Sequence, residues 1–355
     1  MKSPKILETT LRDGSYAIDF SFTVSDTKTI CKELEDAGFE WIEIGHGVGL
    51  NASNAGRGKA VQTDEEYLQA ASSVLKKAKF GMFCIPGIAR LEDIDLAAKY
   101  QMGFIRIGTN VTEVQTSKEY VKKAKEHNMF VAANYMKSYA LPPEKLAEQV
   151  RFSVDYGVDM IYIVDSAGGM FTEDIERYFH AVRSVSNIPI GFHGHDNLGM
   201  AVANSLKMAE LGAEFIDSSL QGMGRSSGNA ATELLVMSLL KKGYDCKIDL
   251  GKVIAIGQKY VYPYFDHGGR SSLDMIAGYA DFHSSYMPLI QKAASKYNID
   301  PIKLIIEVTK VDKVHIDEKK LDAIAAKIEE KSEDYLGKYR FHRYVGEEEY
   351  DWQRL

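Results

Sequence analysis

The chain of 355 residues has few cysteines, and the three that are present lie far apart, at Cys31, Cys84 and Cys246. Disulfide frameworks and structural zinc sites both need cysteines at short, paired intervals, so this spacing predicts neither. Cys31 and Cys84 stand in apolar segments, and we expect buried thiols there. The pattern favours a reducing compartment, and the cytoplasm is the simplest expectation.

Long hydrophobic runs and an excess of basic residues are also absent. No apolar run reaches the ~20 residues of a membrane-spanning helix, and the first five residues lead into a strand pattern without an apolar signal region. The net charge is −7. An acidic chain without a basic arm is a poor candidate for binding nucleic acid. We therefore expect neither a membrane nor a nucleic-acid partner.

What the sequence does contain is a regular alternation of short apolar runs and helical patterns from residue 6 to about 241. Apolar strands that alternate with helices predict a parallel sheet covered by helices. The predicted strands are 6–12, 41–46, 80–85, 104–109, 129–136, 160–166, 189–195 and 215–220. The predicted helices are 25–37, 64–78, 93–101, 117–127, 143–156, 172–186, 199–211 and 229–242.

Eight such units in about 240 residues predict a closed (β/α)8 TIM barrel, an α/β fold. A doubly wound open sheet would carry a glycine-rich turn after its first strand. Here that strand runs instead into Arg-Asp-Gly-Ser-Tyr at 12–16. We predict a catalytic barrel over 1–265 and a helical C-terminal domain over 266–355, with helices at 250–265, 271–297, 301–310 and 317–332 and a charged tail from 337.

Metal-ligating side chains follow the first and seventh predicted strands. His193 and His195 are two positions apart, so on a strand they point to the same face. In a TIM barrel the functional residues lie at the C-terminal ends of the strands, where Asp13 joins them. Two imidazoles and one carboxylate suit a catalytic divalent metal with open coordination positions. Two buried, hydrogen-bonded histidines remain the alternative interpretation of the His-Gly-His motif alone.

Arg12, next to the predicted ligand Asp13, suits an oxyanion or a substrate carboxylate, or else an ion pair with Glu8 or Glu43. The glycine-rich loops at 45–49 and 222–229 lack the phosphate-loop pattern and favour lids over phosphate binding. The charges at Arg57, Lys59 and Arg225 could reach an anionic substrate, although solvated charge is the simpler interpretation.

Three motifs together resemble the metal-dependent lyase superfamily of HMG-CoA lyase, isopropylmalate synthase and 4-hydroxy-2-oxovalerate aldolase. They are Thr-Thr-Leu-Arg-Asp-Gly at 9–14, Gly-Phe-His-Gly-His-Asp-Asn-Leu-Gly at 191–199, and Ser-Leu-Gln-Gly-Met-Gly at 219–224 with Gly-Asn at 228–229. The aldolase branch is most similar, because Gly45-His46-Gly47, Val-Asp-Ser at 164–166 and Gly278-Tyr279-Ala280 also match. The resemblance covers about residues 6–300.

The resemblance implies a pyruvate aldolase that cleaves or forms a 4-hydroxy-2-oxo acid through an enolate. It implies metal ligation by Asp13, His193 and His195, with Asn229 as a further candidate. Mn²⁺ is the expected ion, with Mg²⁺, Co²⁺ and Zn²⁺ as alternatives. Arg12 then stabilises the enolate, and Ser166 and His46 are expected to contact the substrate. The implied partners are a 2-oxo acid and an aldehyde, an aldehyde dehydrogenase, and a second copy in a homodimer.

The chain departs from the aldolase pattern at two positions. The aldolases carry a histidine base two residues after Arg-Asp-Gly, where this chain has Tyr16, and a tyrosine in the C-terminal segment, where this chain has His283. We therefore predict that His283 is the acid/base group and that Tyr16 orients it or the substrate hydroxyl. Loss of the aldol base and a changed reaction is the rival hypothesis. The altered pocket leaves the aldehyde unidentified, with a larger or more polar one allowed.

Two further functions remain as alternatives. A Claisen-type transferase would join an acyl-CoA to a 2-oxo acid, and thiol release from acetyl-CoA would detect it. A catalytically degenerate barrel would act as a scaffold and would need no stoichiometric metal. The joint presence of Arg12, Asp13, His193 and His195 argues against the scaffold.

Overall fold

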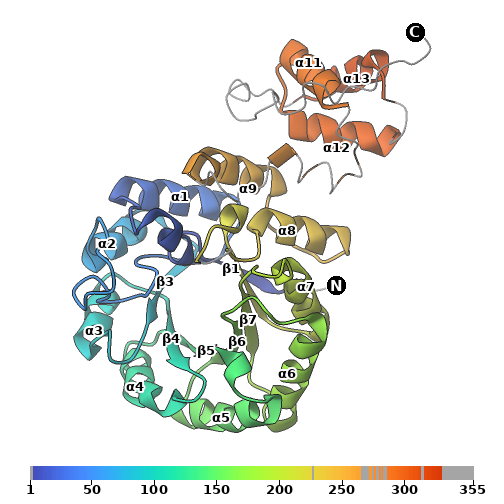
Figure 1. The fold of residues 1–355 in the computed structure, drawn as a ribbon. Coiled ribbons are helices and arrows are strands. Elements are labelled where there is room, and N and C mark those ends of the chain that lie inside the picture. The colour runs from blue at the N-terminus through green and yellow to red at the C-terminus, as the bar shows by residue number, and fades with distance from the viewer. Residues whose placement is uncertain are drawn as a thin grey trace. The chain divides into compact units, whose positions relative to one another are not determined.

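A computed structural model describes residues 3–225, 228–264, 272–273, 276, 280, 282, 286–312 and 316–329. The chain divides into two compact units, Met1–Ile256 and Gly257–Leu355. In the first unit eight parallel strands form a closed barrel in the order of the sequence, ringed by helices (Figure 1). The predicted TIM barrel is confirmed. No helix among the described residues combines the length and apolar character needed to cross a bilayer.

The barrel elements follow the predicted alternation closely. The strands are β1 (Lys5–Glu8), β2 (Trp41–Glu43), β3 (Lys79–Cys84), β4 (Phe104–Asn110), β5 (Phe130–Met136), β6 (Met160–Asp165), β7 (Ile190–Gly194) and β8 (Phe215–Ser218). The helices are α1 (Val24–Asp36), α2 (Asp64–Val74), α3 (Leu91–Lys99), α4 (Lys118–Glu126), α5 (Pro143–Tyr156), α6 (Thr172–Val185), α7 (Ala201–Leu211), α8 (Thr232–Lys241) and α9 (Leu250–Ile256).

The first strand is shorter than predicted. It ends at Glu8, because the next backbone carbonyl, that of Thr9, accepts hydrogen bonds from the amides of Arg12 and Asp13 at 3.1 and 2.8 Å. This turn folds the chain back and begins a short 3₁₀ helix at Asp13. Arg12 and Asp13 therefore lie in a tight turn above the barrel rather than on the strand.

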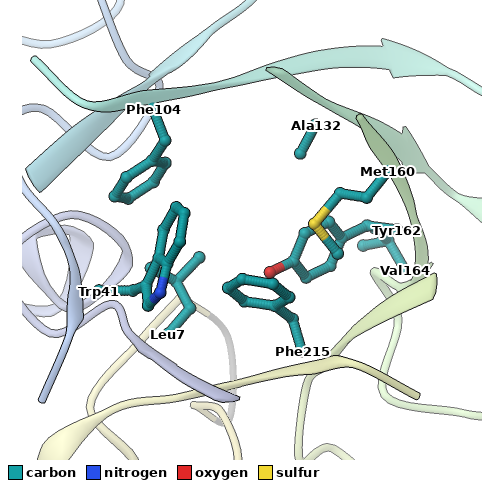
Figure 2. Close-up of a cluster of buried hydrophobic side chains, with 8 residues drawn as sticks. All are labelled: Leu7, Trp41, Phe104, Ala132, Met160, Tyr162, Val164 and Phe215. Atoms are coloured by element: carbon teal, nitrogen blue, oxygen red, sulfur yellow. The ribbon is translucent and has the colours of Figure 1, made fainter. Parts of the chain in front are cut away.

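An apolar plug lies inside the barrel, and four of its members, Trp41, Phe104, Met160 and Phe215, are the first residues of their strands (Figure 2). Its members are Leu7, Trp41, Phe104, Ala132, Met160, Tyr162, Val164 and Phe215. The Trp41 ring lies 5.2 Å from the ring of Phe104 and 4.9 Å from that of Phe215, centroid to centroid. Gly81 gives the Phe104 ring its space, since a Cβ at that position would come within 2.4 Å of the ring. The plug therefore fills the barrel interior near the start of these strands with apolar side chains.

The second unit is described in part. A π-helical turn (Gly257–Val261) and a 3₁₀ turn (Tyr262–Tyr264) stand where we predicted that one helix would continue to 265. The later helices are α11 (Met287–Tyr297), α12 (Pro301–Val311) and α13 (Glu318–Ala325). Ion pairs from Lys292 to Glu318 at 2.8 Å and from Lys296 to Asp322 at 2.7 Å join α11 to α13.

Candidate metal centre and substrate site

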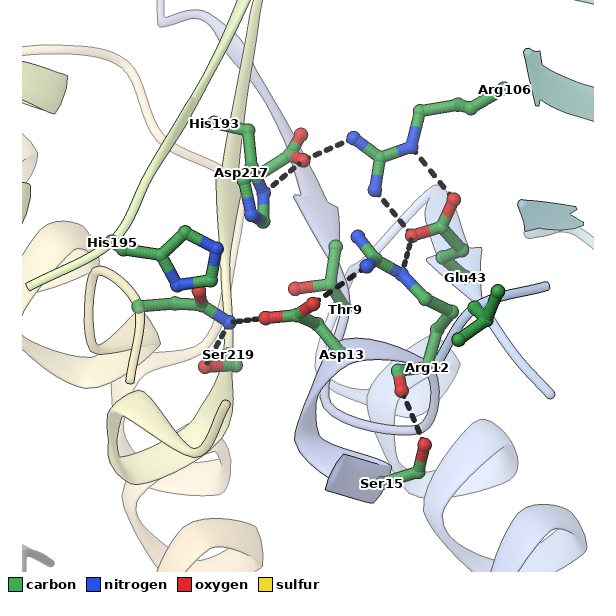
Figure 3. Close-up of polar contacts among 12 residues, drawn as sticks. Thr9, Arg12, Asp13, Ser15, Glu43, Arg106, His193, His195, Asp217 and Ser219 are labelled. Carbon is green, nitrogen blue, oxygen red and sulfur yellow. Dashed lines mark hydrogen bonds and ion pairs between the residues drawn. The ribbon is translucent and has the colours of Figure 1, made fainter. Parts of the chain in front are cut away.

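Asp13, His193 and His195 meet at the C-terminal end of the barrel, as Figure 3 shows. Asp13 comes from the turn after β1, and both histidines come from the end of β7. One ligand atom from each side chain lies within 4.8 Å of those of the other two, and all three residues are buried. Figure 3 also shows Arg12 and Ser219 beside this group. The candidate ligands from the first and seventh strands therefore lie together, as predicted.

The hydrogen bonds of the two histidines define which nitrogen faces the centre. His193 Nδ1 lies 2.9 Å from a carboxylate oxygen of Asp217, and His195 Nδ1 lies 3.2 Å from the carbonyl oxygen of Gly228. Both partners are acceptors at neutral pH, so both Nδ1 atoms carry the proton and donate. The Nε2 atoms then keep their lone pairs. Burial lowers the pKa of His195 to about 4, which keeps its imidazole neutral at pH 7.

Asp13 and Asn229 supply the oxygen atoms of the site. Burial acts to raise the pKa of Asp13, but the charges of Arg12 and the histidines outweigh it, so the carboxyl is ionised. Its Oδ1 accepts from Arg12 Nη1 at 2.6 Å, and its Oδ2 accepts from Asn229 Nδ2 at 2.7 Å. The Oδ1 atom of Asn229 is buried and has no hydrogen-bond partner in the described part of the chain. An orphaned buried oxygen at this place requires a donor or a cation.

The donor set fits a divalent metal ion. Two neutral imidazoles, one carboxylate and one orphaned amide oxygen are the mixed nitrogen and oxygen ligands that Mn²⁺, Co²⁺ and Zn²⁺ accept. The Nδ1 hydrogen bonds to Asp217 and Gly228 are the kind of contact that orients metal-binding histidines. The residues present therefore favour a catalytic ion over the alternative of two structural histidines.

A network of buried charges extends from Asp13 to His193. Its members are Asp13, Arg12, Glu43, Arg106, Asp217 and His193, joined in that order (Figure 3). Glu43 accepts from Arg12 Nε at 2.6 Å and from Arg106 Nε at 2.7 Å, and Arg106 also pairs with Asp217. Three carboxylates and two guanidiniums leave one buried negative charge, which a divalent cation would offset.

The full network was not predicted from the sequence. Glu43 was expected only as an alternative ion-pair partner of Arg12, and the places of Arg106 and Asp217 in the network were not predicted. The available signal was a charged residue at an inward position of an otherwise apolar strand, as in the Phe-Ile-Arg-Ile run of β4 and the Phe-Ile-Asp run of β8. Lys, Arg, Asp and Glu are almost never fully buried without a partner, so these three positions predict one another.

Arg12 shows both of the roles that the sequence left open. It is ion-paired with Glu43, as the structural alternative proposed, and it also contacts the candidate metal ligand Asp13. These bonds use Nε and Nη1, and among the described residues no hydrogen bond is made by Nη2. The guanidinium is thus fixed from one side with donors left over. The guanidinium carbon of Arg12 also lies 4.9 Å from the ring centroid of Phe83.

The rings of Tyr16 and His46 both pack against Phe20, whose ring centroid lies 5.2 Å from that of Tyr16. Burial raises the pKa of the Tyr16 phenol, so the group stays protonated at neutral pH and is not available as a base. The His46 ring stacks on Phe20 at 3.8 Å. Its Nδ1 accepts from the Val48 amide and its Nε2 lies 3.1 Å from the Gly58 carbonyl oxygen, so both ring nitrogens have internal partners. His46 holds the loop after β2, and any substrate contact would use its ring face.

Ser166 lies directly after β6, and its Oγ accepts a hydrogen bond from the Lys137 amide at 2.9 Å. Its hydroxyl proton stays available for a carboxylate. His283 lies outside the described residues, so its predicted role as the acid/base group stays a prediction.

The loop after β8 packs directly on the candidate ligands. Gly224 has no side chain, and a Cβ there would come within 2.4 Å of Asn229 Nδ2 and 2.9 Å of Asp13 Oδ2. Gln221 takes a left-handed backbone conformation, with φ of 57°, and is held by the buried carboxylate of Glu233 at 2.8 and 2.9 Å. The predicted glycine-rich loop therefore lies close against the metal centre.

Comparison with known proteins agrees with this geometry. The HMGL-like family model matches residues 3–259. The chain belongs to the HMGL-like family. It is 37% identical over 316 residues to a 4-hydroxy-2-oxovalerate aldolase of Carboxydothermus hydrogenoformans, covering 88% of this chain and 94% of that protein. It is 41% identical over 252 residues to an oxaloacetate decarboxylase of Mycobacterium tuberculosis, covering 71% of this chain and 74% of that protein.

Solved structures support the same fold. The HMG-CoA lyase of Bacillus subtilis superposes with a TM-score of 0.66 at 18% identity, covering 76% of this chain and 96% of that one. The predicted resemblance to the HMG-CoA lyase and aldolase superfamily is thus confirmed, as is the prediction that the chain is a carbon–carbon lyase. The residues Asp13, His193 and His195 form a candidate metal site in a family barrel.

Proposed function

We propose that this HMGL-like protein is a divalent-metal-dependent pyruvate aldolase, acting on a 4-hydroxy-2-oxo acid. The observation that carries the proposal is the arginine that touches a metal ligand. Arg12 donates one hydrogen bond to Asp13 and another to Glu43. The guanidinium is therefore a fixed positive charge directly beside the candidate metal site. The similarity to 4-hydroxy-2-oxovalerate aldolases over most of the chain supports the substrate class.

The chemistry of such a cleavage follows from charge. Breaking the bond between C3 and C4 leaves an electron pair that becomes an enolate, and the C4 hydroxyl loses its proton to form the aldehyde. A bound divalent ion would act as a Lewis acid for the oxygens of the 2-oxo acid. Arg12 offers its remaining N–H donors to the developing negative charge in a buried site, where a fixed donor needs no reorganisation. Ser166 is proposed to donate to the substrate carboxylate.

The proton of the C4 hydroxyl requires a base. Tyr16 is a poor one, since burial raises its pKa above the ordinary value. A histidine titrates near neutral pH, so we propose that His283 is the base and that Tyr16 orients it or the substrate hydroxyl.

Paired variants test the base. We expect His283→Ala to lower the rate of pyruvate release by about 10²- to 10⁴-fold, the usual contribution of general acid–base catalysis. Tyr16→Phe should have a smaller effect, because it removes only an orienting hydroxyl. Pyruvate release is measured with a coupled lactate dehydrogenase assay. Full activity of His283→Ala would refute the assignment, and rescue of that variant by added imidazole would strengthen it.

The function as a whole is tested by metal dependence. The purified protein is stripped with a chelator and reloaded with Mn²⁺, Co²⁺, Mg²⁺ or Zn²⁺, and cleavage of 4-hydroxy-2-oxovalerate is followed as pyruvate. We expect activity to disappear on stripping and to return on reloading, with Mn²⁺ the best ion. Equal activity with and without metal would contradict the proposal.

A second candidate function is decarboxylation of a 2-oxo dicarboxylic acid such as oxaloacetate. The specific observation in its favour is Tyr16 itself. Loss of CO₂ leaves the same kind of enolate but removes no hydroxyl proton, so it needs no base at that position. The similarity to an oxaloacetate decarboxylase at 41% identity supports this candidate. Measurement of CO₂ and of aldehyde from the corresponding substrates separates the two reactions.

We also propose that the protein forms a homodimer. We propose in addition that it binds an aldehyde dehydrogenase, which would take up the released aldehyde. Size-exclusion chromatography with light scattering tests the dimer. A monomer at micromolar concentration would contradict it.

A further inference from the structure

Arg225 stands at the edge of the candidate metal site. It follows Gly224, whose backbone packs against Asp13 and Asn229. Its guanidinium carbon lies 5.8 Å from the ring centroid of Tyr16, over the face of that ring. The same positive charge also acts on His195, where it adds to the lowering of the pKa that burial causes. Arg225 is therefore within electrostatic reach of the candidate metal site, although its own side chain is exposed.

The charge of Arg225 has no carboxylate partner among the residues that the structure describes. This contrasts with Arg12 and Arg106, which are each paired with Glu43. Arg225 is exposed, so its charge costs little in desolvation and stays available to a ligand. A guanidinium resting on an aromatic face is pre-oriented, which favours bidentate contact with a carboxylate.

We infer that Arg225 and Tyr16 form an anion subsite that selects an aldehyde carrying a carboxylate. The inference rests on the proposed aldolase function and names its substrate class. Arg12 lies within the charged network at the metal centre, where pyruvate binds in the proposal. Arg225 is a second cation beside Tyr16 that is not part of this network, so we assign it to the half of the substrate that departs as aldehyde. That half is then a semialdehyde acid rather than a neutral aldehyde.

The synthetic direction offers the clearest test. A proton leaves the methyl group of pyruvate, the resulting C3 carbanion bonds to the aldehyde carbon, and the aldehyde oxygen takes up a proton. We compare succinic semialdehyde with butanal, which has the same four-carbon chain without the charge, and glyoxylate with acetaldehyde. Product formation is followed by mass spectrometry with the metal-loaded, full-length protein.

We expect the wild type to prefer the carboxylate aldehyde of each pair. Arg225→Gln should lower kcat/KM for the carboxylate aldehydes by about 10- to 100-fold, the usual effect of losing a charged hydrogen bond, and should lower kcat/KM for butanal far less. For the carboxylate aldehydes, kcat/KM of Arg225→Lys should fall between the values of the wild type and of Arg225→Gln. Arg151→Gln removes the same charge from the exposed side of α5 and should change neither substrate. In the wild type, added salt should raise KM for the carboxylate aldehydes alone.

The outcomes separate the inference from the function beneath it. Exchange of the pyruvate methyl protons with D₂O reports enolate formation without any aldehyde. No exchange and no product with any aldehyde would mean that the proposed function fails. Normal exchange with no preference for the charged aldehydes, or an Arg225→Gln variant that lowers both classes equally, overturns the inference alone. So does an effect seen in Arg57→Gln but not in Arg225→Gln.

Discussion

The two ends of the barrel interior are built by the same strands but have opposite character. Near the strand N-termini lies the apolar plug, and two residues later on the same strands lies the charged network. The pairs are Trp41 and Glu43 on β2, Phe104 and Arg106 on β4, and Phe215 and Asp217 on β8. A period of two places both members of each pair inside the barrel.

The difference between these ends separates stability from chemistry. The plug gains free energy from the apolar area that it removes from water, whatever the detailed partners. The charged network must offset the desolvation of each ion by a matched partner, and a buried ion pair is weak evidence for added stability. The network is therefore explained by what it holds: Asp13 and His193 at its two ends and Arg12 between them.

The largest effect is expected at the ligand end of the network. Asp13→Asn keeps the volume of the side chain and removes its charge. We expect stoichiometric metal to be lost and activity to fall by about 10³-fold or more, since a Lewis-acid ion supplies several kcal/mol. Elemental mass spectrometry and the pyruvate assay measure both. Ser15→Ala is a neighbouring control that leaves every candidate ligand in place. Normal metal content in Asp13→Asn would remove the basis of the comparison.

The plug should affect stability and spare the chemistry. Trp41→Ala should lower the free energy of unfolding by about 3–5 kcal/mol, the cost of a large buried aromatic, and leave metal affinity unchanged in the folded fraction. Arg106→Met should cost about as much, because it leaves Glu43 with Arg12 as its one guanidinium partner and Asp217 with His193 alone, but it should also weaken metal binding. Urea unfolding and metal titration provide the two readouts. If both variants weaken metal binding equally, the two ends of the barrel interior do not have separate roles in stability and chemistry.

A smaller effect is expected one contact away from the ion. Asp217→Asn removes the charge that faces His193 Nδ1, and we expect metal affinity to fall by about 10- to 100-fold. Ser218→Ala, next along β8, removes no contact to a candidate ligand and serves as the control. Competition with a metallochromic indicator gives the affinities. An unchanged affinity in Asp217→Asn would mean that the network does not orient the ligand.

The smallest effect concerns two buried carboxyls, Glu8 and Glu233, that make no ion pair within the part of the chain that the structure describes. Burial raises the pKa of each to about 7, above the ordinary value of 4.5. The folded protein then binds more protons than the unfolded chain between these pH values, so their contribution to stability is complete at low pH and is lost as the pH rises through 7.

Substitution by glutamine should therefore flatten the pH dependence of unfolding. Relative to wild type, Glu233→Gln should remove up to about 1.4 kcal/mol of stability loss per pH unit between pH 5 and 7. Urea unfolding at half-unit pH intervals measures it, with the exposed Glu173→Gln as control. Parallel curves for wild type and Glu233→Gln would contradict the raised pKa.

The fold and the candidate ligands could be predicted because they follow local rules. Alternating apolar runs and helical patterns specify β/α units, and the barrel rule places Asp13 and His195 at one end. The buried positions of Cys31 and Cys84 were also predicted correctly, from their apolar neighbours. These features depend on short stretches of sequence.

The rest depended on contacts between distant strands. Arg106 reaches Asp217 across 111 positions and Glu43 across 63, and no local pattern encodes either distance. The early end of β1 depended on one carbonyl, that of Thr9, which accepts hydrogen bonds from the amides of Arg12 and Asp13. In an extended strand these amides would have been available to a neighbouring strand. Both tautomers likewise became assignable only when Asp217 and the Gly228 carbonyl were in view.

The strict two-residue spacing of plug and network has a consequence for how this gene can vary. Deleting the codon of Ile105 would make Phe104 and Arg106 neighbours on β4, and they would then point to opposite faces of the sheet. Either the plug would lose Phe104, or Glu43 and Asp217 would lose the cation that they share. A substitution changes one position of one layer, whereas a frame-preserving deletion in these strands breaks the spacing that lets one strand serve both layers. Length changes among relatives should therefore be confined to the loops and helices, and an inventory of tolerated single-residue deletions should show β2, β4 and β8 as gaps.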